Sequence, residues 1–227
     1  MPCEEVYRDS AASTMKLMSQ IPHKQLSLAL LLSCAAAFGQ YKAEPAGAPP
    51  SGLSPSISAT LQQDGTKITN NGSPYLEIWL VKTKPSGPPS TESDVTLPSI
   101  PQGALIGVLR FDAQGSDRRG QTIKPGIYTL RYSNMPVNGD HQGAAPQRDF
   151  LLMTPAASDT DAKATPAFDA LVKQSTQASG TPHPAVISIW KPEDNKTGFS
   201  QQGSDWVLQT KLGDTPIAII LVGTASA

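Results

Sequence analysis

Short runs in which apolar and polar residues alternate dominate the chain from residue 75 onward. In residues 75–82, Leu76, Ile78 and Leu80 fall on one side of an extended chain, which is the period of a half-buried strand. Comparable runs predict strands at residues 104–112, 127–132, 149–154, 185–191, 205–211 and 216–223. Residues 217–222 are apolar throughout, so we expect a central strand there that is buried on both faces.

Turn signals separate these runs. Asp64-Gly65 lies between two short runs and predicts a hairpin, because both central positions of such a turn need positive φ. Residues 166–176 carry an apolar stripe at helical spacing after Thr165, which could cap a helix. The pattern as a whole predicts a mainly β fold: an antiparallel β-sandwich of about eight strands with one short helix.

The N-terminal part has a different pattern. Basic residues around Lys16 and Lys24 precede an apolar core at residues 26–38 of about thirteen residues, too short to span a bilayer and typical of a secretory signal peptide. Ala37-Phe38-Gly39 resembles a cleavage site, whereas the context of Cys34 resembles a lipidation site. We therefore predict a secreted or periplasmic protein, with a lipid-anchored envelope protein as the alternative.

Three segments follow from this interpretation. Residues 1–39 are an N-terminal extension and signal peptide, and residues 40–55 are a linker rich in Pro, Gly and Ala. Residues 56–227 are the β-sandwich domain, with no transmembrane span. Both cysteines, Cys3 and Cys34, precede this domain, which therefore depends on core packing without a disulfide.

Composition narrows the function classes. The chain has 18 basic and 19 acidic residues, and aromatic residues make up 6%. Nucleic-acid binders carry a basic excess that displaces counterions from phosphates, so we do not expect a nucleic-acid partner. No phosphate-binding loop or nucleophile elbow occurs in the sequence, and we expect no cofactor and assign no catalytic residue.

Charged residues concentrate in two predicted loops. One contains Asp117, Arg118 and Arg119, and the other runs from Asp140 and His141 to Arg148 and Asp149. If the flanking strands are neighbours, both loops could open at one end of the sandwich, where binding residues commonly lie. The alternative is a network of surface ion pairs that orients long loops.

Two histidines, His141 and His183, lie in the predicted domain. With Asp140 or Asp149 they could ligate zinc and serve a metal-dependent hydrolase if the fold brought them together. Their spacing has no short-range ligand motif, so this is the alternative to a non-catalytic protein that binds a ligand or protein partner or has a structural role in the cell envelope.

Several segments resemble one protein family. They are Glu77–Leu80, Thr122–Tyr132, Asn138–His141, Arg148–Leu152, Gly180–Val186 and Asp205–Leu208. Over residues 55–225 they are similar to a family of uncharacterised secreted proteins of environmental bacteria. The resemblance implies export and a β fold, and it carries no catalytic residue to this chain.

Overall fold

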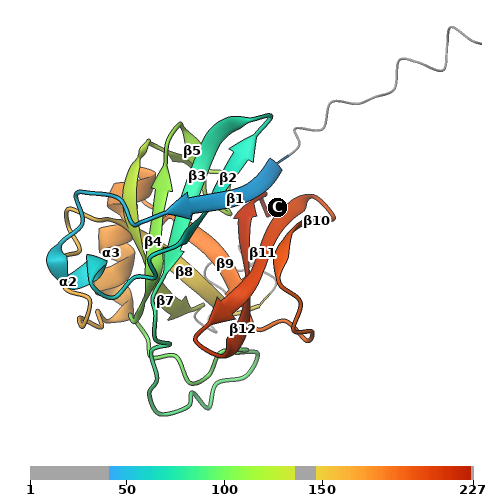
Figure 1. The fold of residues 1–227 in the computed structure, drawn as a ribbon. Helices are drawn as coiled ribbons and strands as arrows, with labels where there is room; N and C mark the ends of the chain where they lie inside the picture. The colour runs from blue at the N-terminus through green and yellow to red at the C-terminus, as the bar shows by residue number, and fades with distance from the viewer. Residues whose placement is uncertain (1–40, 136–146, 226–227) are drawn as a thin grey trace, which may run out of the picture. The chain divides into compact units, whose positions relative to one another are not determined.

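The computed structural model describes residues 41–135 and 147–225 of the chain. Ten of its strands form one antiparallel sheet that is nearly closed into a barrel (Figure 1). The order around the barrel is β1-β2-β3-β4-β7-β8-β9-β12-β11-β10. These strands are β1 (Tyr41–Gly47), β2 (Gly65–Asn70), β3 (Ser73–Leu80), β4 (Leu105–Phe111), β7 (Gly126–Asn134), β8 (Asp149–Pro155), β9 (Val186–Trp190), β10 (Gly198–Gln202), β11 (Asp205–Leu212) and β12 (Thr215–Val222).

The mainly β, antiparallel prediction is confirmed, but the two-layer sandwich differs from the observed architecture. Strand pairing continues without a break from β3 through β4, β7, β8, β9 and β12, so one sheet curls around the main core. Alternation along each strand shows which face is buried, not whether two sheets stack or one sheet closes. As predicted, β12 lies inside the sheet, and Ile217 to Leu221 are all buried.

The ordered domain begins earlier than the sequence suggested. Residues 41–47 form β1 within the stretch expected to be a linker, and they pair with β2 from Tyr41–Asn70 to Gly47–Gly65. Pro45 lies in this strand beside a register shift, and edge strands and bulges are the places in a sheet where proline is tolerated. Backbone pairing at an edge needs no apolar periodicity, so the sequence pattern did not reveal this strand.

The predicted hairpin is displaced. The tight turn joins β2 to β3 at Asn71 and Gly72, whose φ angles of 50° and 81° are those of a type I′ turn. Gly65 instead begins β2, where a Cβ would overlap the indole ring of Trp79. The glycine of the Asp-Gly pair is therefore required by packing. Earlier in the chain, between β1 and β2, residues 55–58 form a short helix, α2 (Pro55–Ser58), and the side chain of Ser54 caps its first turn.

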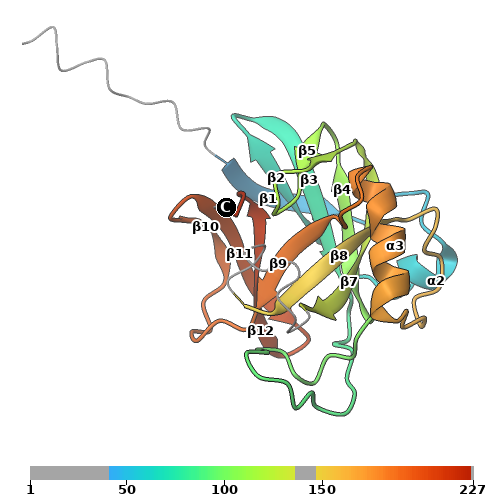
Figure 2. The same cartoon turned by 180° about the vertical axis from the view of Figure 1, so that it is seen from behind.

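One longer helix, α3 (Phe168–Ser179), covers the outer face of the sheet beside β8 (Figure 2). It begins later than predicted, at Phe168, and its N-cap residue, Ala167, provides no side-chain hydrogen bond. It ends at Gly180, whose φ of 66° is left-handed. Leu171 packs there with Phe150, Leu152 and Val186, separately from the main core inside the barrel.

Two short strands and an aromatic contact complete the barrel. The strands β5 (Gly115–Ser116) and β6 (Thr122–Ile123) form a ribbon in the connection from β4 to β7. The edge strands β1 and β10 do not pair with each other. The rings of Tyr41 on β1 and Trp206 on β11 instead meet edge to face, 5.6 Å apart. In the described ranges no helix has the length and apolar character needed to cross a bilayer.

Candidate functional site

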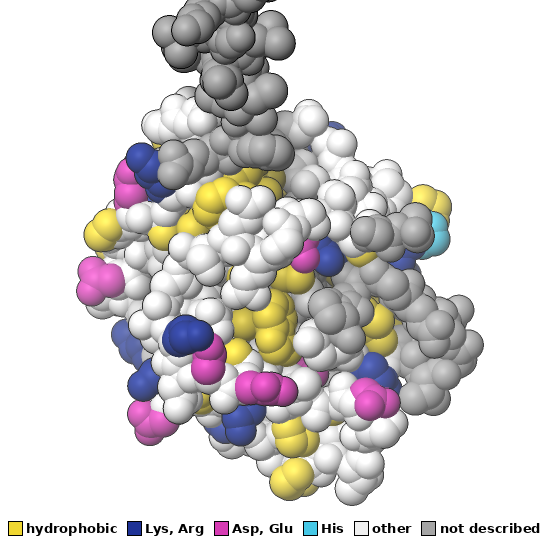
Figure 3. All heavy atoms as spheres, turned by 90° about the vertical axis from the view of Figure 1, so that its right-hand side faces the viewer, with side chains coloured by type: hydrophobic (Ala, Val, Ile, Leu, Met, Phe, Trp, Pro, Cys, Tyr) yellow, Lys and Arg dark blue, Asp and Glu magenta, His cyan; other side chains and the backbone are white. Residues whose placement is uncertain are grey.

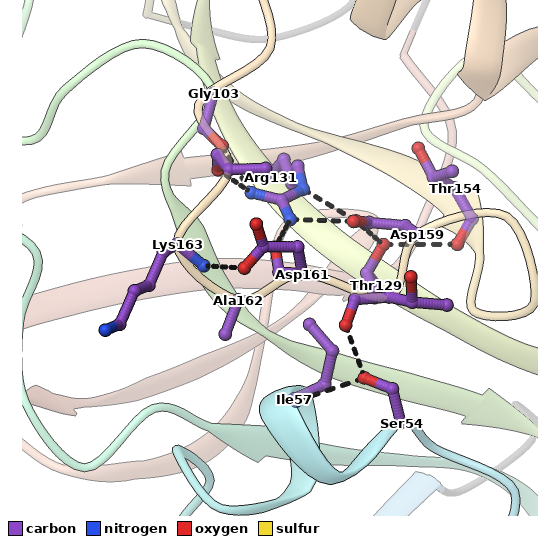
Figure 4. A network of polar contacts seen from close by, with 12 residues as sticks. Ser54, Ile57, Gly103, Thr129, Arg131, Thr154, Asp159, Asp161, Ala162 and Lys163 are labelled. Atoms are coloured by element: carbon purple, nitrogen blue, oxygen red, sulfur yellow. Dashed lines mark hydrogen bonds and ion pairs between the residues drawn. The ribbon is translucent and has the colours of Figure 1, made fainter.

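Among the described residues, the largest charged side chain that is fully buried is that of Arg131 on β7, which is 0% exposed (Figure 4). Asp159 binds it through two parallel hydrogen bonds, Nε to Oδ2 at 2.6 Å and Nη2 to Oδ1 at 2.7 Å. Its remaining donors reach the carbonyl oxygens of Gly103, Asp161 and Ala164. All of its nitrogens therefore have partners, and the group ties the 159–164 segment and the start of β4 to the sheet.

A second buried carboxylate, Asp149, is 0% exposed at the start of β8. It accepts hydrogen bonds from the backbone N–H and hydroxyl of Thr96, the N–H of Leu97 and the hydroxyl of Tyr132. This predicted site residue thus anchors the long connection between β3 and β4. Its oxygens are occupied by donors from the protein itself, so it has no evident capacity for a ligand.

The hydrogen bond between Tyr132 and Asp149 has a consequence at high pH. Burial, and then the neighbouring Asp149, raise the pKa of the Tyr132 hydroxyl above its ordinary value. The unfolded chain therefore releases this proton near its ordinary pKa of about 10 while the folded protein retains it. The free energy of unfolding should fall as pH rises above that value, by about 1.4 kcal/mol per pH unit for this one proton.

Tyr132→Phe removes the titrating group, so we expect a shallower loss of stability above about pH 10. Denaturant unfolding of both proteins on either side of that pH measures the two slopes. Equal slopes would contradict the role assigned to Tyr132.

Asp117 holds the connection between β4 and β7 in place. It is 1% exposed and accepts hydrogen bonds from the backbone N–H groups of Arg119, Gln121 and Val186. Burial raises the pKa of this carboxyl group, and these hydrogen bonds oppose the shift. Beside it, Arg118 forms an ion pair with Asp205 at 2.5 Å, while Arg119 is exposed. The Asp117 carboxylate thereby fixes this connection against the start of β9.

The two predicted loops do not converge. The connection that carries Asp117 joins β4 to β7, and the one before Arg148 joins β7 to β8. Because β4, β7 and β8 are antiparallel neighbours, Arg118 and Arg119 lie between β4 and β7 at one end of β7, whereas Arg148 directly precedes β8 at the other end. The hypothesis that Arg118 and Arg119 share one site with Arg148 is therefore wrong.

The structure describes only some of the residues in the proposed metal site. Asp140 and His141 lie outside the described residues, and His183 is exposed just before β9. Within ranges 41–135 and 147–225, no group of three His, Cys, Asp or Glu side chains is arranged to hold a metal ion. Cys34 also lies outside these ranges.

Arg148, one of the predicted site residues, borders a pocket. Its Nε donates to the carbonyl oxygen of Met135 at 2.8 Å, its Nη1 donates to that of Ser93 at 3.0 Å, and its Nη2 pairs with Glu92. The pocket beside it has a volume of about 600 Å³, within the range of small-molecule sites. Its lining comprises Pro88, Ser90, Glu92, Ser93, Pro98, Ile100, Pro101, Gln102, Asn134, Met135, Arg148 and Phe168.

Two amide groups in the wall of this pocket were not predicted. The Nε2 of Gln102 and the Oδ1 of Asn134 are buried atoms that have no hydrogen-bond partner among the described residues. Gln102 also accepts a hydrogen bond from Ser133 through its Oε1, so its side chain is held in place. Neither residue belongs to a sequence motif, and only the fold shows that they border one pocket.

The fold and the pocket define a β-barrel-like protein with a candidate binding site at the end where residues 82–101 lie, the green segment at the bottom of Figure 1. Comparisons with protein-family models, with curated proteins and with solved structures give no match. Figure 3 shows acidic and basic side chains interspersed on one face, without a continuous area of one sign among the coloured residues.

Proposed function

We propose that this is an exported, non-catalytic protein that binds a ligand in the pocket beside Arg148. The observation that carries the proposal is the pocket itself, whose lining includes Gln102 and Asn134, two amide side chains that each keep one buried atom without a hydrogen-bond partner among the described residues. A buried polar atom without a partner costs about 1–3 kcal/mol, so a ligand toward which the two amide groups rotate would recover part of that energy by supplying the missing bonds.

The surroundings favour an uncharged ligand. The positive charge of Arg148 is already balanced by Glu92, and the side chains of Ile100, Met135 and Phe168 contribute apolar surface. A compound with an amide or hydroxyl pair next to an apolar group matches this combination. Peptides and sugars both belong to this class.

Export rests on the N-terminal sequence. A basic segment, an apolar core too short to span a bilayer and a small-residue cleavage site form a secretory leader, which would place the domain in the periplasm or outside the cell. A lipid anchor at Cys34 is the alternative form. A ligand-binding role in the cell envelope is compatible with the freely exported form and with the lipid-anchored form.

A thermal-shift screen tests the proposal. Neutral dipeptide amides, sugars, organic acids and metal ions are each added to the protein, because a ligand that binds only the folded state raises the unfolding midpoint. We expect a neutral, hydrogen-bonding compound to raise it and Asn134→Leu to abolish the shift. The unliganded Asn134→Leu protein should be as stable as the parent or more stable, since an unpaired acceptor is removed.

Asn195→Leu is the matched control, because Asn195 is exposed and does not line the pocket. It should leave both the shift and the midpoint unchanged. A shift that survives Asn134→Leu, or a strong loss of stability in that variant without ligand, would show that the amide group is structural.

A further inference from the structure

A second pocket, of about 570 Å³, lies on the other side of Pro101, which lines both pockets. It is bounded by the residues after α2, the start of the connection from β3, the start of β4 and the segment before α3. The geometry points to a binding site for an organic carboxylate with an apolar body. This assignment does not depend on the function proposed for the first pocket.

The charge of the lining is entirely positive. Lys82 and Lys163 are its only charged residues, and neither ammonium group has a carboxylate within 4.0 Å among the described residues. The Nζ of Lys82 donates to the carbonyl oxygen of Ala59 at 3.1 Å, which leaves its charge uncompensated. The nearby carboxylate of Asp161 is outside the lining and accepts the backbone N–H of Lys163 at 2.9 Å. An anion in this pocket would therefore meet two positive charges and no lining carboxylate.

The floor of the pocket requires an apolar part in the ligand. Val81, Ala104 and Leu105 are each 4% exposed and line the pocket, and Pro101 adds an apolar wall. A small inorganic anion would leave this surface in contact with water, whereas an alkyl or aryl group would cover it. The combination of two ammonium groups with an apolar floor selects an amphipathic anion.

The walls are held rigidly before any ligand arrives. The Nη1 of Arg131 donates to the carbonyl oxygens of Gly103 and Ala164, which are adjacent in sequence to lining residues on two sides of the pocket. Figure 4 shows the chain at Ala162 and Lys163 held beside this network. A preformed pocket binds more tightly because little ordering is needed on binding.

Isothermal titration of the full-length chain with octanoate tests the assignment. We expect saturable binding that is weakened about tenfold or more in the double variant Lys82→Gln/Lys163→Gln, since both charge contacts are lost. Acetate has the charge without the apolar body, and octylammonium has the apolar body with the opposite charge. Neither should bind.

The control double variant Lys173→Gln/Lys211→Gln changes the net charge equally at two exposed sites outside the pocket, and it should bind octanoate normally. Asn134→Leu should also bind octanoate normally, because it affects only the first pocket. Undiminished binding by the Lys82/Lys163 variant, equal binding of octylammonium, no binding of octanoate, or loss of binding in Asn134→Leu would each overturn the assignment. Unfolding midpoints establish that every variant is folded.

Discussion

Replacing Arg131 with methionine should destabilise the protein by about 3–5 kcal/mol, because it leaves the Asp159 carboxylate buried without its partner. The substitution also deprives three backbone carbonyl oxygens of their donors, those of Gly103, Asp161 and Ala164. Denaturant unfolding of the variant and parent proteins measures the change. The 159–164 segment should in addition become a site of rapid proteolysis.

Two further variants identify the cause. Arg131→Met/Asp159→Leu removes both charges, so it should be more stable than Arg131→Met alone, although the carbonyl oxygens still lack donors. Lys196→Met disrupts an ion pair between exposed side chains and should leave the unfolding midpoint unchanged. A double variant no more stable than Arg131→Met would show that the carbonyl contacts, and not the ion pair, account for the loss.

Asp149→Ala should also cost about 3–5 kcal/mol, because four donors that now meet one carboxylate would lose their acceptor. The loss should be concentrated in the connection that Asp149 anchors, so backbone amides around Thr96 and Leu97 should exchange with solvent much faster. Hydrogen exchange monitored by mass spectrometry measures this directly.

Tyr132→Phe is the comparison for this variant, because it removes one of the four donors and retains the carboxylate. It should cost about 1 kcal/mol near neutral pH and leave exchange at Leu97 nearly unchanged. Unaltered exchange around Thr96 in Asp149→Ala would show that the connection is held by other contacts. Because this connection lines both pockets, the variant should also weaken binding at each of them.

Much of the β framework could be predicted from periodicity. The runs at 75–82, 104–112 and 216–223 correspond to β3, β4 and β12, because burial on one or both faces leaves a pattern in the sequence. Strands held mainly by backbone pairing left no such pattern. Both β1 and β10 are edge strands with mostly exposed side chains, and neither was predicted.

The candidate site residues likewise differ in whether the local sequence identifies them. Local chemistry singled out Asp117, Arg148 and Asp149, and the structure shows that the first and third of these are buried anchors for loops. Arg131 gave no signal, since one arginine in an alternating strand usually faces solvent. Only the tertiary arrangement reveals that the 159–164 segment covers it. The residues that bury and pair Arg131 lie far from it in the sequence. The sequence therefore shows that the residue is charged but does not show whether it is buried or what it contacts.

The seam between β1 and β10 differs from the rest of the barrel wall. Elsewhere neighbouring strands share backbone hydrogen bonds, whereas here the contact between Tyr41 and Trp206 joins the two sides. Rings can slide or separate without breaking a ladder of hydrogen bonds, so we expect the barrel to open first along this line when it is heated or pulled. The edge strands on the two sides of this gap would then separate from the sheet first, and β7 and β8 in the middle of the strand order would separate last.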